Sequence, residues 1–197
     1  ASRNRDAETL LLQQARVNTE LQEGLMRTRM VPFDRLVPRL RRIVRQVASE
    51  LGKQVEFTVG NADGEMDRTV LERIVAPLEH MLRNAVDHGI EGAAVRSKAG
   101  KPEQGSIRLE LGREGGDIVL TLSDDGAGIN LDAVRRKAIE RGLMDPGADL
   151  SEHEILQFIL EAGFSTAEKV TQISGRGVGM DVVNAEVKQL GGSMSID

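Results

Sequence analysis

The sequence contains no cysteine, tryptophan or tyrosine, and each absence removes a class of function. Without cysteine the chain has neither disulfides nor thiolate metal sites, which is compatible with a reducing cytoplasmic environment, the location we expect. Tyrosine and tryptophan supply most base-stacking platforms, and the net charge of −5 opposes binding along a phosphate backbone. We therefore expect no nucleic-acid partner.

Long apolar runs are also missing. No stretch is long enough to span a bilayer and no basic-then-apolar leader is present, so we expect no direct membrane insertion. The 197 residues suffice for one ordinary domain with an appendage. Helical and strand patterns mix without strict βαβ alternation, which predicts an α+β fold.

Residues 6–29 are predicted to form one long amphipathic helix. Its apolar positions follow seven- and four-residue steps: Leu10, Val17, Leu21 and Leu25. Such a helix needs something to pack against, so it is either half of a dimerising hairpin or a peripheral helix docked on its own domain. Pro32 marks a boundary. We expect a partial helical dimerisation segment over residues 1–31 and a second domain over residues 32–197.

Periodicity, caps and turn residues predict the elements of the second domain. Helices are expected at 34–51, 67–88, 131–141, 151–162 and 178–190, and strands at 54–59, 106–111, 117–123 and from 193. Gly89–Gly105 is expected to be a loop with at most a short helix. Ser151 and Glu154 form a capping-box pattern. The helix expected at 34–51 is basic because it carries Arg35, Arg39, Arg41, Arg42 and Arg45. We interpret this run of charges as a solvated face.

The helix predicted at 67–88 places polar side chains on one face. With His80 at zero, Asn84 lies at about 40°, His88 at about 80° and Asp87 at about −20°. Apolar residues occupy the opposite face. A helix with two imidazoles, an amide and a carboxylate on one side is suited to present chemistry, and the alternative is a solvated polar face.

Two glycine clusters extend the pattern. In Asp124-Asp-Gly-Ala-Gly-Ile129, at a strand end, glycines let a flat ligand approach and Asp124 can accept a hydrogen bond from an exocyclic amine; a simple tight turn is the alternative. Gly175-Arg-Gly-Val-Gly-Met180 opens the last helix, where free backbone N–H groups and the helix dipole favour a phosphate. It lacks the strand of a dinucleotide fingerprint and the Gly-Lys-Ser/Thr of a Walker loop.

In combination these motifs resemble the GHKL (Bergerat) ATP-binding family of gyrase, Hsp90, histidine kinases and MutL. The segments His80–Glu91, Gly163–Val183 and Met26–Pro32 closely resemble the CheA-type chemotaxis histidine kinases. The resemblance covers nearly the whole chain. It implies a two-layer α/β sandwich that holds ATP between helices and a flexible lid.

Carried over residue by residue, the resemblance implies a site. Asp124 would accept from the adenine amine, Asn84 would ligate Mg²⁺, and His80 and His88 would be catalytic residues near the phosphates. Phe164 would anchor the lid. The full implied ATP-binding set is Asn84, Asp87, Asp124, Gly126, Gly128, Ile129, Phe164, Ser165, Thr166, Gly175, Arg176, Gly177, Val178, Gly179 and Met180.

The implied activity is transfer of the ATP γ-phosphoryl to a histidine in two-component chemotaxis or motility signalling. No histidine precedes His80, so the phosphoacceptor is expected on a separate domain. The resemblance also implies a homodimer through the N-terminal helix, and a response regulator, a coupling protein and a receptor array as partners through other domains. We expect the kinase domain to be truncated after its last strand begins, which leaves a sheet edge unpaired.

Three alternatives remain at this point. The chain is a non-catalytic dimerisation or scaffold module with a vestigial ATP fold, or it is an ATP-hydrolysing GHKL protein. Hydrolysis needs a carboxylate base near the position of His80, and Glu79 points about 100° away from it. The third alternative is a transition-metal site formed by His80 and His88.

Overall fold

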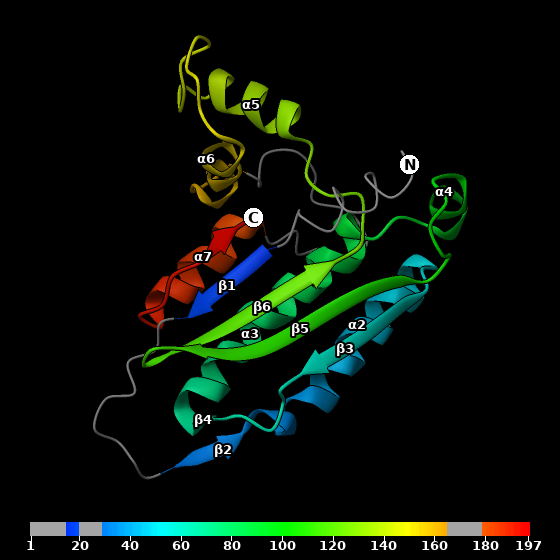
Figure 1. The fold of residues 1–197 in the computed structure, drawn as a ribbon, viewed down its shortest axis with the longest axis vertical. Helices are drawn as coiled ribbons and strands as arrows, with labels where there is room; N and C mark the ends of the chain where they lie inside the picture. The colour runs from blue at the N-terminus through cyan, green and yellow to red at the C-terminus, as the bar shows by residue number, and fades with distance from the viewer. Residues whose placement is uncertain (1–14, 20–28, 165–178) are drawn as a thin grey trace.

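The computed structural model describes residues 15–19, 29–164 and 179–197. They form two layers, a five-stranded sheet with helices packed on one face (Figure 1), which confirms the expected α+β sandwich. The strand order is β3-β5-β6-β1-β7, in which β3 and β5 are parallel and the other neighbours antiparallel. The strands are β1 (Ala15–Thr19), β3 (Val55–Gly60), β5 (Gly105–Glu114), β6 (Asp117–Asp124) and β7 (Ser195–Ile196). The helices of the second layer are α2 (Val37–Leu51), α3 (Arg68–Asn84) and α7 (Met180–Gln189).

The main hydrophobic core lies between these layers. Buried and exposed residues alternate along β5, as expected for a strand with one face on a core. Apolar residues of α2 and α3 pack on that face, and Leu40, Leu82 and Leu109 have no exposed surface. Burial of this apolar surface is the main force that holds the sandwich together.

A second, smaller hydrophobic cluster lies beyond the end of the sheet (Figure 1). It is formed by α5 (Leu131–Glu140), α6 (Glu152–Gln157) and the 3₁₀ helix η3 (Phe158–Leu160). Its buried members are Val134, Ala138, Met144, Ile155 and Phe164. The predicted capping box is confirmed, because Ser151 Oγ accepts from the Glu154 amide and Glu154 accepts from the Ser151 amide.

Three short elements complete the described chain. Strand β2 (Met30–Pro32) pairs with β4 (Glu65–Asp67), and neither strand was predicted. The 3₁₀ helix η1 (Phe33–Arg35) precedes α2, so the helix predicted from residue 34 begins at Val37. A short helix, α4 (Ala93–Lys98), lies in the predicted loop. Among the described helices, none is long and apolar enough to cross a membrane.

The prediction of one helix over residues 6–29 is wrong where the structure describes it. Ala15–Thr19 is strand β1, which lies between β6 and β7 and pairs with both. An isolated amphipathic helix has little stability of its own, whereas the edge of β6 offers a row of unpaired backbone groups. Part of segment 1–31 therefore belongs to the sheet. Among the described residues, β7 pairs with β1 on one side and forms an edge of the sheet on the other. Residues 6–14 and 20–28 of the predicted helix lie outside the described residues.

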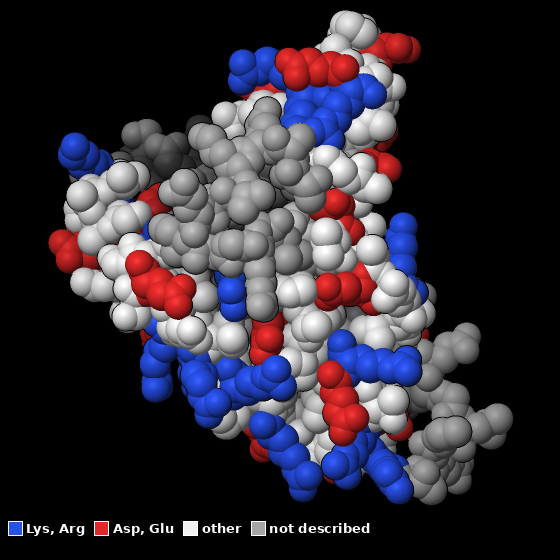
Figure 2. All heavy atoms as spheres, turned by 180° about the vertical axis from the view of Figure 1, so that it is seen from behind, with Lys and Arg blue, Asp and Glu red and all other residues white. Residues whose placement is uncertain are grey.

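The arginines of α2 lie on the helical side of the molecule. Figure 2 shows that Lys and Arg side chains gather over the lower half of this side. Arg39 donates to Glu79 Oε1 at 2.7 Å, and Arg41 donates to the carbonyl of Phe57 at 2.6 Å. Arg42 and Arg45 of α2, and Arg35 of the preceding η1, are exposed to solvent. The exposed face predicted for this helix is confirmed.

Candidate functional site

A cavity of about 240 Å³ opens where α3, the end of β6 and the start of α7 meet. Its walls combine residues from both hydrophobic clusters and from the loop after β6. The lining residues are Met81, Asn84, Ala85, His88, Gly89, Leu122, Asp124, Gly128, Ile129, Ile159, Met180 and Ile196. Six of the residues proposed from the sequence therefore line one cavity: Asn84, His88, Asp124, Gly128, Ile129 and Met180.

Asp124 occupies the last position of β6 at the cavity wall. The amide of Gly126 donates to its Oδ1 at 2.9 Å. Burial raises the pKa of Asp124; the Gly126 hydrogen bond opposes this rise, and the charges of Asp125 and Glu91 add to it. The buried carboxylate is thus an acceptor that gains from a donor on a bound ligand.

Gly126 and Gly128 are required here for different reasons. A Cβ on Gly126 would lie 2.0 Å from the carbonyl oxygen of Gly89, so the loop after β6 packs directly on the end of the α3 region. Gly128 has φ of 76°, a left-handed conformation that favours glycine. Gly126 does not line the cavity, but its close packing fixes the backbone that carries Asp124.

Asn84 is the last residue of α3 and faces the start of α7. Its Nδ2 lies 3.7 Å from Met180 Sδ, so the two cavity residues are in contact. Gly179 is the N-cap of α7, and the Val182 amide donates to its carbonyl at 3.1 Å. The cavity therefore has a helix N-terminus, with its positive dipole end, next to an amide side chain.

After Asn84 the helix widens into a π-helical turn, η2 (Ala85–Gly89). The Ile90 amide donates to the carbonyl of Ala85 at 2.8 Å. This wider turn changes the angular positions predicted at 100° per residue. His88 still reaches the cavity, but Asp87 does not line it, and Asp87 Oδ2 lies 3.6 Å from His88 Nε2.

Lys53 holds this turn from outside the cavity. Its Nζ donates to the carbonyls of Val86 and Asp87 at 2.8 and 2.7 Å. Burial lowers the pKa of Lys53, and the charges of Asp87 and Glu91 oppose this lowering. No sequence signal pointed to this residue, because its partners are backbone atoms distant in the chain.

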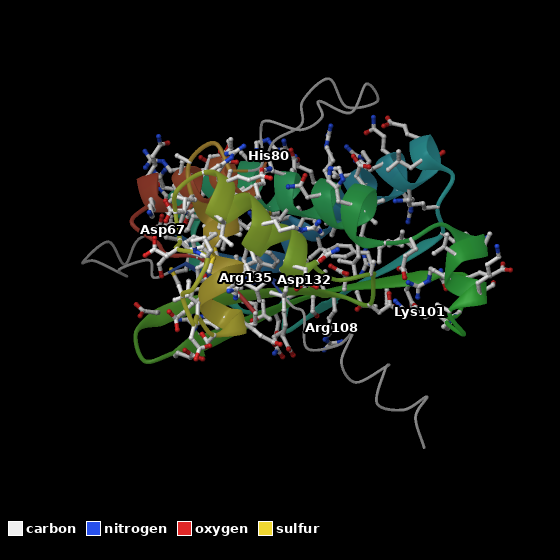
Figure 3. All side chains as sticks on the ribbon, turned by 90° about the horizontal axis from the view of Figure 1, so that it is seen from above. Asp67, His80, Lys101, Arg108, Asp132 and Arg135 are labelled. Carbon is white, nitrogen blue, oxygen red and sulfur yellow. The ribbon has the colours of Figure 1, made fainter. Side chains whose placement is uncertain are left out.

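His80 lies in the helix layer (Figure 3) and does not line the cavity. Its Nδ1 is 3.2 Å from Glu186 Oε1 on α7, close enough for an ion pair but outside hydrogen-bond geometry. Both side chains are largely buried, at 29% and 27% exposure. Glu79, its neighbour in sequence, faces Arg39 instead.

Phe164 lies in the second cluster rather than in the cavity. It is 4% exposed, and the cations of Lys137 and Arg141 lie 5.0 and 5.6 Å from its ring centre. The preceding Gly163 amide donates to Asp181 Oδ2 on α7 at 3.0 Å, which joins the two described ends of the intervening segment. The other predicted lid residues lie outside the described residues: Ser165, Thr166, Gly175, Arg176, Gly177 and Val178.

The apolar wall of the cavity was not predicted from the sequence. Leu122 was discoverable, because it lies two positions before Asp124 on the same face of β6. Met81, Ile159 and Ile196 carried no such signal, since they come from three different elements that meet only in the folded chain. Glu186, which approaches His80 from α7, was likewise missed.

A family comparison identifies the class of this domain. Residues 72–197 match the family described as histidine kinase-, DNA gyrase B- and HSP90-like ATPases, and the chain belongs to that family. The family match implies that this domain binds ATP.

Within this family, the chain is similar in sequence to chemotaxis proteins named CheA. The chain is 44% identical to the chemotaxis protein CheA of Treponema pallidum over 92% of its length and 22% of that protein's. It is 46% identical to CheA of Rhizobium meliloti over 90% of its length and 23% of that protein's. For CheA of Bacillus subtilis the values are 40%, 92% and 27%. The chain thus spans about a quarter of the length of these relatives.

Proposed function

We propose that this chain is the ATP-binding catalytic domain of a CheA-type histidine kinase. In this proposal it transfers the ATP γ-phosphoryl to a histidine on a separate phosphotransfer domain in chemotaxis or motility signalling. The observation that carries the proposal is the joining of Asp124, Asn84 and the start of α7 in one cavity. The likeness to CheA proteins over at least 90% of the chain supports it.

The adenine base of ATP would occupy the end of the cavity near Asp124. Its exocyclic amine would donate to the buried carboxylate, and the apolar side chains of Leu122, Ile129 and Ile159 would cover its faces. A buried acceptor left without a donor costs free energy, so a base without the amine binds less well.

Magnesium fits the described residues only as an ion shared with phosphate. No group of three or more His, Cys, Asp or Glu side chains that could hold a metal occurs in the described parts of the chain. Asn84 offers one amide oxygen, and Mg²⁺ commonly takes its other ligands from phosphate and water. Asn84 would hold the ion through this oxygen, and the chemistry supplied there would be neutralisation of phosphate charge. The same finding gives no support to a transition-metal site at His80 and His88, which face Glu186 and Asp87 respectively.

The phosphates would extend from Asn84 toward the start of α7. There the backbone N–H groups of the first helical turn and the dipole stabilise negative charge. His80 lies one turn before Asn84 on α3, and the nearby Glu186 carboxylate restricts the orientation of its imidazole. His88, at 59% exposure, would contact the ligand from the open side.

A specific observation favours the kinase over a hydrolysing ATPase. Among the described residues that line the cavity, Asp124 is the single carboxylate, and in this proposal it binds the base. Glu79 is paired with Arg39 at 2.7 Å and does not line the cavity. Activation of water requires a general base near the γ-phosphate, whereas a neutral imidazole acceptor is already a nucleophile.

The test has two parts. Calorimetric titration with a non-hydrolysable ATP analogue and Mg²⁺ should show binding that Asn84→Ala makes independent of Mg²⁺. Incubation with labelled ATP and a phosphotransfer domain should then label a histidine of that domain. Absence of binding would favour the scaffold alternative, and phosphate release without a histidine substrate would favour the ATPase. In the intact protein we propose a homodimer, with a response regulator, a coupling protein and a receptor array as partners.

A further inference from the structure

Arg96, on the short helix α4, is completely buried although it carries a charge. Its guanidinium donates to the carbonyls of Pro102 at 2.7 Å and Gln104 at 3.4 Å. It also donates to Glu91 Oε1 at 3.1 Å, to Asp125 Oδ2 at 2.9 Å and to the Asp125 carbonyl at 3.3 Å. A buried cation is costly unless paired, so these bonds are needed to keep Arg96 inside.

A second cation reaches the same place from the loop after α4. Lys101 Nζ donates to Glu91 Oε2 at 2.9 Å and to the carbonyls of Asp125 and Gly126, each at 3.0 Å. Burial alone raises the pKa of Glu91, but the hydrogen bond from Lys101 and the nearby cations outweigh it, and the pKa lies below its ordinary value. Glu91 therefore stays ionised between the two cations. Figure 3 shows Lys101 beside α4.

The two cations converge on the loop that follows Asp124. Asp125 is further tied to β5, because its Oδ1 accepts from the Ser106 amide at 2.8 Å. The Ala127 amide donates to the carbonyl of Gly89 at 2.9 Å. The Gly126 amide in turn donates to Asp124 Oδ1 at 2.9 Å, so the position of this loop sets the position of the Asp124 carboxylate.

We propose that Arg96 and Lys101 are positioning residues for base recognition: they hold the carbonyls of Asp125 and Gly126 and thereby aim Asp124 at the exocyclic amine of a purine. Neither residue lines the cavity. The inference rests on the proposed function, because it requires a nucleotide base against Asp124. Selectivity for the nucleotide base then depends in part on the ionic cluster of Glu91, Arg96 and Lys101, which lies outside the cavity lining.

The test compares ATP with inosine triphosphate, which has a 6-oxo group in place of the amine. Affinities are measured by calorimetry on this chain, for the wild type, Lys101→Met and Arg96→Lys. Lys98→Met is the matched control, since Lys98 lies on α4 with Arg96 and its side chain is exposed. Lys101, with 14% side-chain exposure, is the milder substitution, and a thermal melt establishes that each variant is folded.

We expect Lys101→Met to reduce the ratio of ATP to inosine triphosphate affinity by about 3- to 10-fold, as for loss of a charged hydrogen bond. Arg96→Lys keeps the charge but loses the planar fork, so the ratio should fall with it too. Lys98→Met should leave the ratio unchanged. An unchanged ratio in folded Lys101→Met, or an equal loss for both nucleotides, would overturn the inference. Failure of the wild type to bind either nucleotide would overturn the proposed function itself.

Discussion

At the residue scale, Gly126 is a position that leaves no room for a side chain. A Cβ there would lie 2.0 Å from Gly89 O and 2.8 Å from Asp124 Oδ1, both far inside contact distance. The obstacle includes backbone as well as side chain, so the loop itself would have to move. The glycine therefore couples the end of β6 to the turn after α3.

The first prediction follows from this contact. Gly126→Ala should weaken nucleotide binding by about tenfold or more, which corresponds to about 1.4 kcal/mol, because the displaced loop carries Asp124 with it. Calorimetric titration with ATP measures the loss. Gly116→Ala is the control, since a Cβ in that β5–β6 turn meets nothing within 4 Å. Equal affinities of the two variants would contradict this account of the loop.

The buried carboxylate of Asp124 gives a second prediction, on pH. Because burial raises its folded-state pKa, the folded protein holds the proton to higher pH than the unfolded chain does. Ionised Asp124 therefore destabilises the ligand-free protein, and its cost is complete only above the raised pKa. Asp124→Asn should raise the melting temperature by a few degrees at pH 7.

That gain should shrink as the pH falls through the raised pKa and vanish below about 4, the ordinary aspartate pKa. Thermal melts from pH 3 to 8 measure it. The same variant should lose its preference for ATP over inosine triphosphate. A gain that persisted undiminished at pH 3 would show that ionisation of Asp124 is not its cause.

At the scale of elements, the π-helical turn η2 decides which polar side chains reach the cavity. The sequence pattern correctly predicted that α3 buries one face and that Asn84 and His88 lie together. It misplaced Asp87, because the pattern assumes 100° per residue and cannot register a wider turn. Lys53 donates to two backbone carbonyls of this turn, and such bonds leave no trace in periodicity.

The third prediction concerns this support. Lys53→Met removes hydrogen bonds from a charged donor to the carbonyls of Val86 and Asp87, and should lower the free energy of unfolding by about 1 kcal/mol, since the group is partly exposed. Urea denaturation measures the change. Lys188→Met, at an exposed lysine of α7, is the control and should have little effect. Equal midpoints for the two variants would show that Lys53 does not support the turn.

At the scale of the whole molecule, the described chain has two separate hydrophobic clusters. Local signals predicted most of their elements: β3, the β5–β6 hairpin, α5 and the capped start of α6. Contacts between distant segments were not predictable, which is why β1, the β2–β4 pair and Glu186 were missed. The site followed the same division, since motifs identified its polar residues and long-range packing supplied its walls.

The fourth prediction separates the two clusters. Leu40→Ala, at a fully buried position of the main core, should lower the global free energy of unfolding by about 2–5 kcal/mol. Ile155→Ala, in the second cluster, should instead accelerate amide hydrogen exchange within α5 and α6 while β5 and β6 stay protected. Mass-spectrometric exchange measures both. Uniform acceleration by Ile155→Ala would show that the two clusters open as one unit.

The cavity lies across the boundary between these clusters. Ile129 and Ile159 belong to the smaller one, whereas Met81 and Leu122 belong to the larger. If the two clusters open separately, a ligand that touches both links their opening equilibria, and such linkage is reciprocal. The ligand opposes opening of α5 and α6 by a certain factor, and opening of these helices lowers the affinity of the ligand by the same factor. Substitutions in α6 that destabilise the smaller cluster should therefore lower the affinity of the ligand.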